Sequence, residues 1–143
     1  MRSRGFVAAV SLGFISVSGC SSGPSELPDR AAAATKAEEA RVVTVLSADR
    51  SVLGEPGVCT VRLLGQSAGA SFVWALCQAL ESSHATSLPL RIDGSKVIKP
   101  QDGGAYADSV RTMFPEDLAE RILEDQGAPE LRPSAVPPSF PGG

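Results

Sequence analysis

The chain has 143 residues, of which 43% are hydrophobic and 20% are charged, as is typical of a small globular domain. The formal net charge is −3, and without Arg2 and Arg4 the remaining chain has 11 basic and 16 acidic residues. This acidic balance argues against nucleic acid as a partner, since nucleic-acid binding requires a basic surface. The single histidine, His84, and scattered carboxylates do not make a metal-ligand pattern, so we expect no metal and no other cofactor.

The first twenty residues have the three parts of an export signal. Arg2 and Arg4 form a positive start, residues 6–17 form an apolar run, and residues 17–20 place small side chains before Cys20. The apolar run is too short to span about 30 Å of hydrocarbon stably.

This segment resembles the signal peptide of bacterial lipoproteins, and residues 17–20, VSGC, match its lipobox. The resemblance implies that the sulfur of Cys20 receives diacylglycerol, that cleavage occurs just before Cys20, and that the new amino group can be acylated. Two or three acyl chains anchor a protein stably. We therefore expect a protein anchored in the cell membrane by lipid, on the extracytoplasmic face. The alternative is an ordinary secretory signal cut elsewhere, which leaves a free thiol.

The organisation expected from these boundaries has four parts. Residues 1–19 are the signal peptide, and residues 20–29 are the lipidated cysteine and a flexible tether rich in serine and glycine. Residues 30–127 form one small domain. Residues 128–143 contain five prolines and little to bury, which predicts a disordered tail.

The domain begins with a predicted helix over residues 31–50, because AAAATKAEEAR consists of strong helix formers. Val42 and Leu46 continue a helical spacing, whereas the run VVTV over residues 42–45 favours a strand. The second half of this segment is left open between helix and strand.

The runs VCTVRLLG and ASFVWALC predict a β-hairpin around a three-residue loop centred on Ala68. Cys59 and Cys77 are equidistant from Ala68, so this register places them opposite each other, within the reach of a disulfide. An oxidising extracytoplasmic compartment favours that bridge. Two buried free thiols are the alternative.

The same register divides the hairpin into two faces. One carries both cysteines and only apolar side chains, and we expect it to face the core. The other places Arg62 opposite Trp74, where the guanidinium can stack on the indole, with Phe72 nearby. This second face is either covered by the C-terminal helix, or open as an aromatic binding patch made of Arg62, Phe72 and Trp74.

A second hairpin is predicted where LPLRI and SKVIK meet at Asp93-Gly94. A short helix over residues 106–113 follows, and then another that Pro115 starts and Gly127 ends. The predicted fold class is therefore α+β: an N-terminal helix, an antiparallel sheet of about four strands in two hairpins, and short C-terminal helices. This order is loosely similar to cystatin-like folds.

Residues 65–69 read Gly-Gln-Ser-Ala-Gly, and LLGQSAGAS resembles the nucleophile elbow of carboxylesterase-type α/β-hydrolases. The resemblance implies a strand-to-helix turn with Ser67 as the nucleophile of a small serine hydrolase. Only about forty residues of the expected mature chain precede the motif, and His84 follows Ser67 by 17 positions, which does not suit that fold. The secondary structure of residues 70–77 distinguishes a nucleophile elbow from a β-hairpin, because the elbow requires a helix there and the hairpin requires a strand.

The sequence therefore predicts a non-enzymatic interaction or accessory module, anchored to the membrane and binding an unidentified envelope protein. The alternatives are the serine hydrolase using Ser67 and a purely structural envelope protein.

Overall fold

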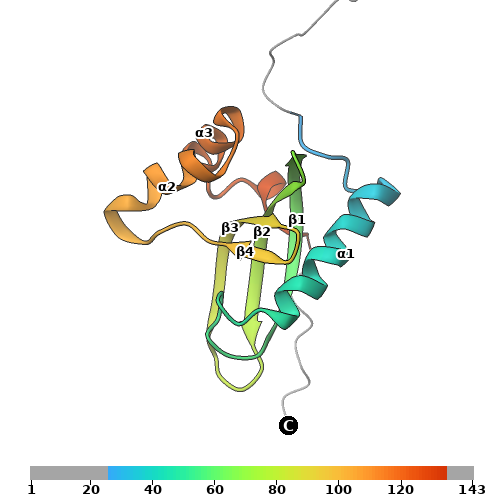
Figure 1. The fold of residues 1–143 in the computed structure, drawn as a ribbon, viewed down its shortest axis with the longest axis vertical. Coiled ribbons are helices and arrows are strands. Elements are labelled where there is room, and N and C mark those ends of the chain that lie inside the picture. The colour runs from blue at the N-terminus through green and yellow to red at the C-terminus, as the bar shows by residue number, and fades with distance from the viewer. Residues whose placement is uncertain (1–25, 135–143) are drawn as a thin grey trace, which may run out of the picture.

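The computed structural model describes residues 26–134, which form an α+β fold. Its elements are α1 (Ala33–Ala48), β1 (Gly57–Ser67), β2 (Ala70–Ala79), β3 (Ala85–Asp93), β4 (Lys96–Ile98), α2 (Tyr106–Met113) and α3 (Glu116–Glu124), with 3-10 turns at Gly103–Ala105 and Pro129–Leu131 (Figure 1). The strands make one antiparallel sheet in the order β1-β2-β3-β4. The predicted fold class and both predicted hairpins are confirmed.

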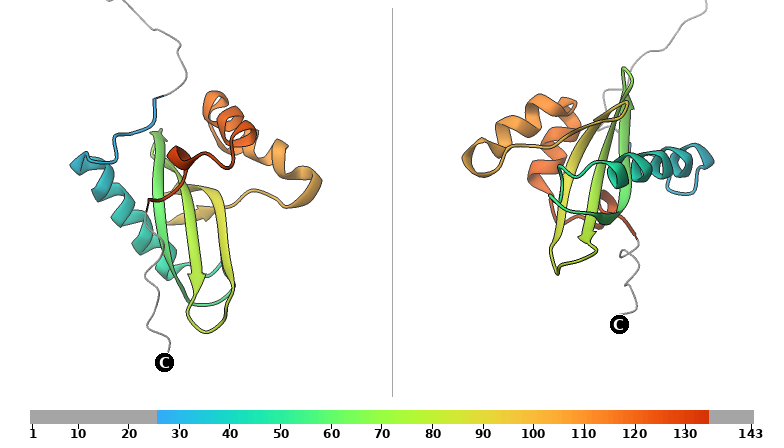
Figure 2. Two further views of the ribbon diagram at one scale, coloured as in Figure 1. Left: turned by 180° about the vertical axis from the view of Figure 1, so that it is seen from behind. Right: turned by 60° about the horizontal axis from the view of Figure 1, so that its bottom comes forward.

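The sheet lies between two helical layers, with α1 on one face and α2 and α3 on the other (Figures 1 and 2). Alternate residues along each strand therefore enter two different cores. The core under α1 contains Val42, Leu46, Val61, Leu63, Val73, Ala75, Cys77, Leu90 and Ile92. The core under α2, α3 and residues 128–131 contains Leu64, Phe72, Trp74, Val110, Phe114, Leu118, Ile122 and Leu131, among others.

Residues 42–45, for which the sequence allows either a helix or a strand, are helical, and α1 continues to Ala48. Val42 and Leu46, four residues apart, are both buried against the sheet. Burial of this pair on one helical face outweighs the strand preference of the β-branched run around it.

The first hairpin confirms that Cys59 pairs with Cys77, but the predicted three-residue loop is wrong. The turn has only two residues, Ala68 and Gly69, whose φ angles of 50° and 80° are those of a type I′ turn. An irregularity in β1 at Leu64 supplies the extra residue, and it shifts the register by one position. The turn is one residue shorter than predicted and β1 contains one extra residue, so Cys59 still lies opposite Cys77.

The turn of the second hairpin lies one residue later than predicted. Asp93 pairs with Lys96, so the turn residues are Gly94 and Ser95. Gly94 has a φ of 62°, which suits the first turn position of a type II′ turn.

The C-terminal part differs from the prediction at its boundaries. Helix α2 has the predicted limits, whereas α3 starts at Glu116 after Pro115 and ends at Glu124, before Gly127. Residues 128–134 were expected to belong to a disordered tail, but they are folded, and Leu131 is completely buried. The reason is that Leu131 completes the core under α3, a role that the proline content of the segment conceals. Residues 135–143 lie outside the described part of the chain.

Candidate functional site

The predicted aromatic patch is not open. Arg62, Phe72 and Trp74 are only 4%, 4% and 2% exposed. Helices α2 and α3 and the segment after them cover this face of the sheet, and Phe114 packs against Phe72 with a ring separation of 5.5 Å. The covered alternative is therefore correct, and these three residues do not form a surface for a partner.

Trp74 is held by two residues that the sequence did not point to. Its Nε1 donates a hydrogen bond to Ser87 Oγ at 2.8 Å, and the guanidinium of Arg132 lies 4.2 Å from the ring centroid. The expected stacking of Arg62 on Trp74 is wrong, although the two residues do pair across the strands. Arg132, more than fifty residues away in the chain, makes the cation–π contact instead.

Arg62 connects the two ends of the described chain to the middle of β1. Its Nη2 donates to the carbonyl of Pro28 at 2.7 Å, and its Nε donates to the carbonyl of Glu130 at 3.3 Å. Its Nη1 is buried and has no hydrogen-bond partner among the described residues, with Glu39 Oε1 at 3.9 Å. Burial, and then the nearby charge of Arg30, lower the pKa of Arg62 from its ordinary value.

Arg30 makes a second connection between the two terminal segments. It donates hydrogen bonds to the carbonyls of Pro129, Glu130 and Arg132 and to Ser134 Oγ, the last at 2.6 Å. Together with Arg62 it holds residues 28–30 and 129–134 against β1. Sequence reasoning missed these contacts because backbone carbonyls some hundred residues away leave no local signal.

The outer edge of β1 has no neighbouring strand in the described sheet. Leu63 directs its N–H outward, where Glu39 Oε1 of α1 accepts it at 2.8 Å. Backbone groups of a strand alternate between its two sides, so those of Cys59 and Val61 also point outward. Within residues 26–134, no hydrogen bond from another element reaches the backbone of Cys59 or Val61.

A groove of about 360 Å³ follows this edge. One wall is the face of α1 that carries Lys36, Glu39, Ala40 and Val43, and the other is β1 at residues 59–61. Arg30, Pro133 and Ser134 also line it. The groove therefore combines apolar side chains, such as Ala40, Val43 and Val61, with charged residues and outward-directed backbone groups, and an extended chain can bind to such a surface. It is the candidate functional site.

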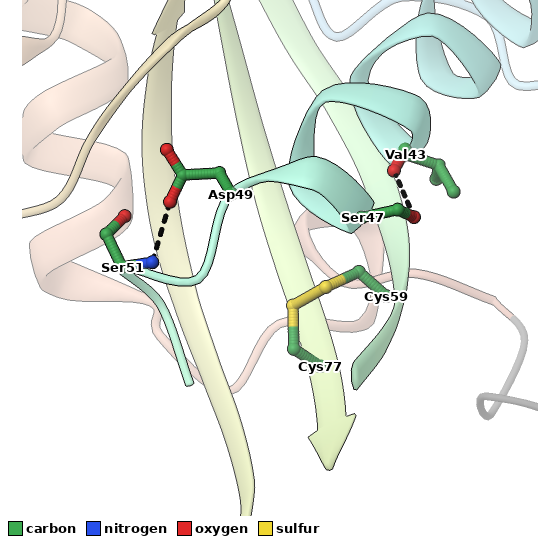
Figure 3. The surroundings of a disulfide bond; sticks show 6 residues. All are labelled: Val43, Ser47, Asp49, Ser51, Cys59 and Cys77. Carbon is green, nitrogen blue, oxygen red and sulfur yellow. Dashed lines mark hydrogen bonds between the residues drawn. A yellow bond between two sulfur atoms is a disulfide. The ribbon is translucent and has the colours of Figure 1, made fainter. Parts of the chain in front are cut away.

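The predicted disulfide is present next to this groove. Cys59 and Cys77 are bonded, with their Cα atoms 4.1 Å apart, and the bridge lies beside the last turns of α1 (Figure 3). Cys77 is fully buried, whereas Cys59 also lines the groove. The bond joins the edge strand covalently to β2.

Ser67 does not have the geometry of a nucleophile elbow. It ends β1, and the residues after the turn form β2, where the hydrolase family has a helix. His84 lies beyond the other end of β2, and ten strand residues span about 30 Å. Ser67 instead borders a polar cluster in which Ser71 Oγ donates to Glu38 Oε1 at 2.5 Å, and Glu38 pairs with Arg41.

Cys20 and the lipobox lie outside the described residues. The acidic side chains of α3 line a groove of about 670 Å³, but no three potential metal ligands converge anywhere in residues 26–134. None of the helices in that range has the length and hydrophobicity to cross a bilayer.

Comparisons with family models, with curated proteins and with solved structures give no match. The loose likeness to cystatin-like folds therefore has no support from a solved structure.

Proposed function

We propose that this chain is an exported, lipid-anchored protein of the bacterial envelope whose domain acts as a non-enzymatic interaction module. The Cys59–Cys77 disulfide is the observation that carries the proposal. Disulfides form and persist in oxidising compartments outside the cytoplasm, and are rare within it. The lipobox match makes Cys20 the anchoring residue in this proposal.

The anchor would hold the domain close to the bilayer. Six peptide steps separate Cys20 from Glu26, the first described residue, and at most about 3.6 Å per residue gives roughly 20 Å of reach. The acidic domain has little electrostatic attraction for anionic lipid, so attachment depends on the acyl chains. In this arrangement, the groove along β1 is the feature that favours an interaction role over a purely structural one, because it can accept an extended segment.

The test of the proposal is detergent phase partitioning of the expressed protein. The wild-type chain should enter the detergent phase, and Cys20→Ser should move to the aqueous phase. The double variant Cys59→Ala/Cys77→Ala is the matched control, since it loses two cysteines and keeps Cys20, and it should stay in the detergent phase. Retention of an exported Cys20→Ser protein in the detergent phase would contradict the lipid anchor.

A further inference from the structure

We propose that the partner of the groove along β1 is an extended segment of another polypeptide that carries an acidic side chain, and that it binds as an added strand on the outer edge at Cys59 and Val61. This inference rests on the proposed function and deepens it, since it names the chemistry of the partner. Backbone hydrogen bonds supply the binding, and Lys36 supplies the preference for a carboxylate.

The two edges of the sheet differ in how they are protected. Along the outer side of β3, β4 pairs with residues 91–93, and the next outward residue is Pro89, which is buried and has no N–H. Such a proline prevents another strand from pairing there. The outward groups of β1 belong to Cys59 and Val61, each of which has an N–H and a carbonyl. An added strand can therefore bind at β1 and not at Pro89.

Glu39 determines where the added strand ends. Its Oε1 accepts the N–H of Leu63 at 2.8 Å and so occupies the next outward position of β1. The outward groups of Cys59 and Val61 lie about 6.6 Å apart, because each extended residue rises about 3.3 Å. The groove therefore binds a short strand, whose hydrogen bonds do not reach Leu63.

The charges of the groove favour a partner with a carboxylate. Arg30 and Glu39 are already engaged in hydrogen bonds within the domain. Lys36 is exposed, and none of the ion pairs within residues 26–134 includes it. Lys36 therefore attracts an acidic side chain of the added segment. Beside it, Ala40 and Val43 offer contacts to small apolar side chains.

The walls of the groove favour a single strand over a second copy of the domain. Helix α1 and residues 133–134 both line the groove beside the edge of β1. Neighbouring strands lie about 4.8 Å apart, so a partner strand must enter between these walls. In a second copy the same walls flank β1, and two edges flanked in this way cannot approach to that distance. An extended segment of another polypeptide has no such walls.

NMR titration of the full chain with synthetic peptides tests the proposal. The probe is Ac-SVDVTS-NH2, and two comparison peptides replace its Asp by Lys or both Val by Pro. The Asp peptide should bind saturably below about 5 mM and slow the amide exchange of Cys59 and Val61 by about tenfold or more. The proline peptide should not bind, because it lacks two donors of the strand. The amides of Arg62 and Leu63 should keep their exchange rates, since they already donate within the domain.

Charge reversal identifies the residue that recognises the acid. Lys36→Glu should weaken binding of the Asp peptide by about fivefold and strengthen binding of the Lys peptide by a similar factor, which is the size of one exposed ion pair. Lys96→Glu, at an exposed lysine of β4, is the matched control and should change neither affinity.

Several outcomes would overturn the proposal. They are the absence of saturation by the Asp peptide, saturation that leaves Cys59 and Val61 unprotected, and equal binding of the Asp and Lys peptides. Protection of both amides without peptide would overturn it as well, because the chain itself or, if protection falls on dilution, a second copy would then fill the groove. Cys20→Ser should bind the Asp peptide like the wild type, so a failure here is distinguishable from a failure in detergent partitioning.

Discussion

Arg62 Nη2 and the carbonyl oxygen of Pro28 lie 2.7 Å apart, which fastens the segment at the start of the described chain to the middle of an edge strand. The same guanidinium holds the carbonyl of Glu130, so one buried side chain connects both terminal segments to the sheet. If the proposed anchor at Cys20 is correct, this contact lies close to the point where the domain leaves its tether. The tether would then join the domain at a segment that is hydrogen-bonded to β1.

Replacement of Arg62 should destabilise the fold. Arg62→Met removes two hydrogen bonds. The half-buried carbonyl of Pro28 loses its charged donor, whereas the carbonyl of Glu130 keeps Arg30, so the free energy of unfolding should fall by about 2 kcal/mol. Arg62→Lys should be intermediate, because one ammonium cannot reach both carbonyls. Urea denaturation measures the effect, and Arg50→Met, at an exposed arginine, is the control. An unchanged free energy of unfolding in Arg62→Met would contradict the stabilising role of these hydrogen bonds.

The disulfide should contribute substantially to stability. It closes a loop between residues 18 positions apart, which corresponds to about 3 kcal/mol by restriction of the unfolded chain. Cys59→Ala/Cys77→Ala should therefore have a lower urea midpoint than the oxidised wild type, and reduced wild type should resemble the variant. Mass spectrometry of a non-reduced digest should recover the linked peptides. Two thiols that react with an alkylating agent in freshly purified native protein would refute the bridge.

Glu38 should make stability depend on pH. A hydrogen bond from Arg41 is the main cause that lowers the pKa of Glu38 below its ordinary value of 4.5, and Ser71 also contributes. Because the folded-state pKa is the lower one, the stabilisation is complete above pH 4.5 and is lost as the pH falls through the folded-state value. Glu38→Gln should be less stable than wild type at pH 7, and the difference should shrink below pH 4. Urea titrations at pH 7, 5 and 3 measure it, and a constant difference would contradict this account.

Ala68 occupies an unfavourable backbone conformation that another residue would accept better. Its φ is 50°, in the left-handed region, and it precedes Gly69 in a type I′ turn. Asn-Gly is a preferred pair for that turn, so Ala68→Asn should raise the free energy of unfolding by about 0.5–1 kcal/mol. Ala68→Val should lower it, since a β-branched residue fits this conformation poorly. Thermal denaturation ranks the three proteins, and the opposite order would refute the turn assignment.

Trp74 fluorescence should report the covering of the second sheet face. The ring is 2% exposed, so acrylamide should quench it weakly in the native protein. Arg132→Ala removes the cation–π contact and the hydrogen bonds to Gln126 and Ser87, which should increase quenching and cost about 1–2 kcal/mol of stability. Arg50→Ala, at an exposed arginine outside α2 and α3, is the control and should change neither quantity. Strong quenching in the wild type would mean that the face is open.

Local sequence patterns determined the elements of this protein and the pairing of its cysteines. Helix formers predicted α1, and alternating apolar runs with turn residues predicted both hairpins. The symmetric placement of Cys59 and Cys77 predicted the disulfide even though the loop between them was assigned one residue too long. These signals are local because hydrogen bonding within a helix or a hairpin depends on residues that are close in the chain. The lipobox at Cys20 is a local signal as well, and its consequence stays a prediction.

Tertiary structure alone decided which surfaces are covered and which groups meet. The burial of Trp74 depends on α3 and on Leu131, and its cationic partner is Arg132 rather than the cross-strand Arg62. The contact of Arg62 with Pro28 and Glu130 joins backbone atoms from opposite ends of the domain. A backbone carbonyl is present at every residue, so no sequence pattern distinguishes the one that a distant arginine will reach. Only the packing of the terminal segments against β1 selects it.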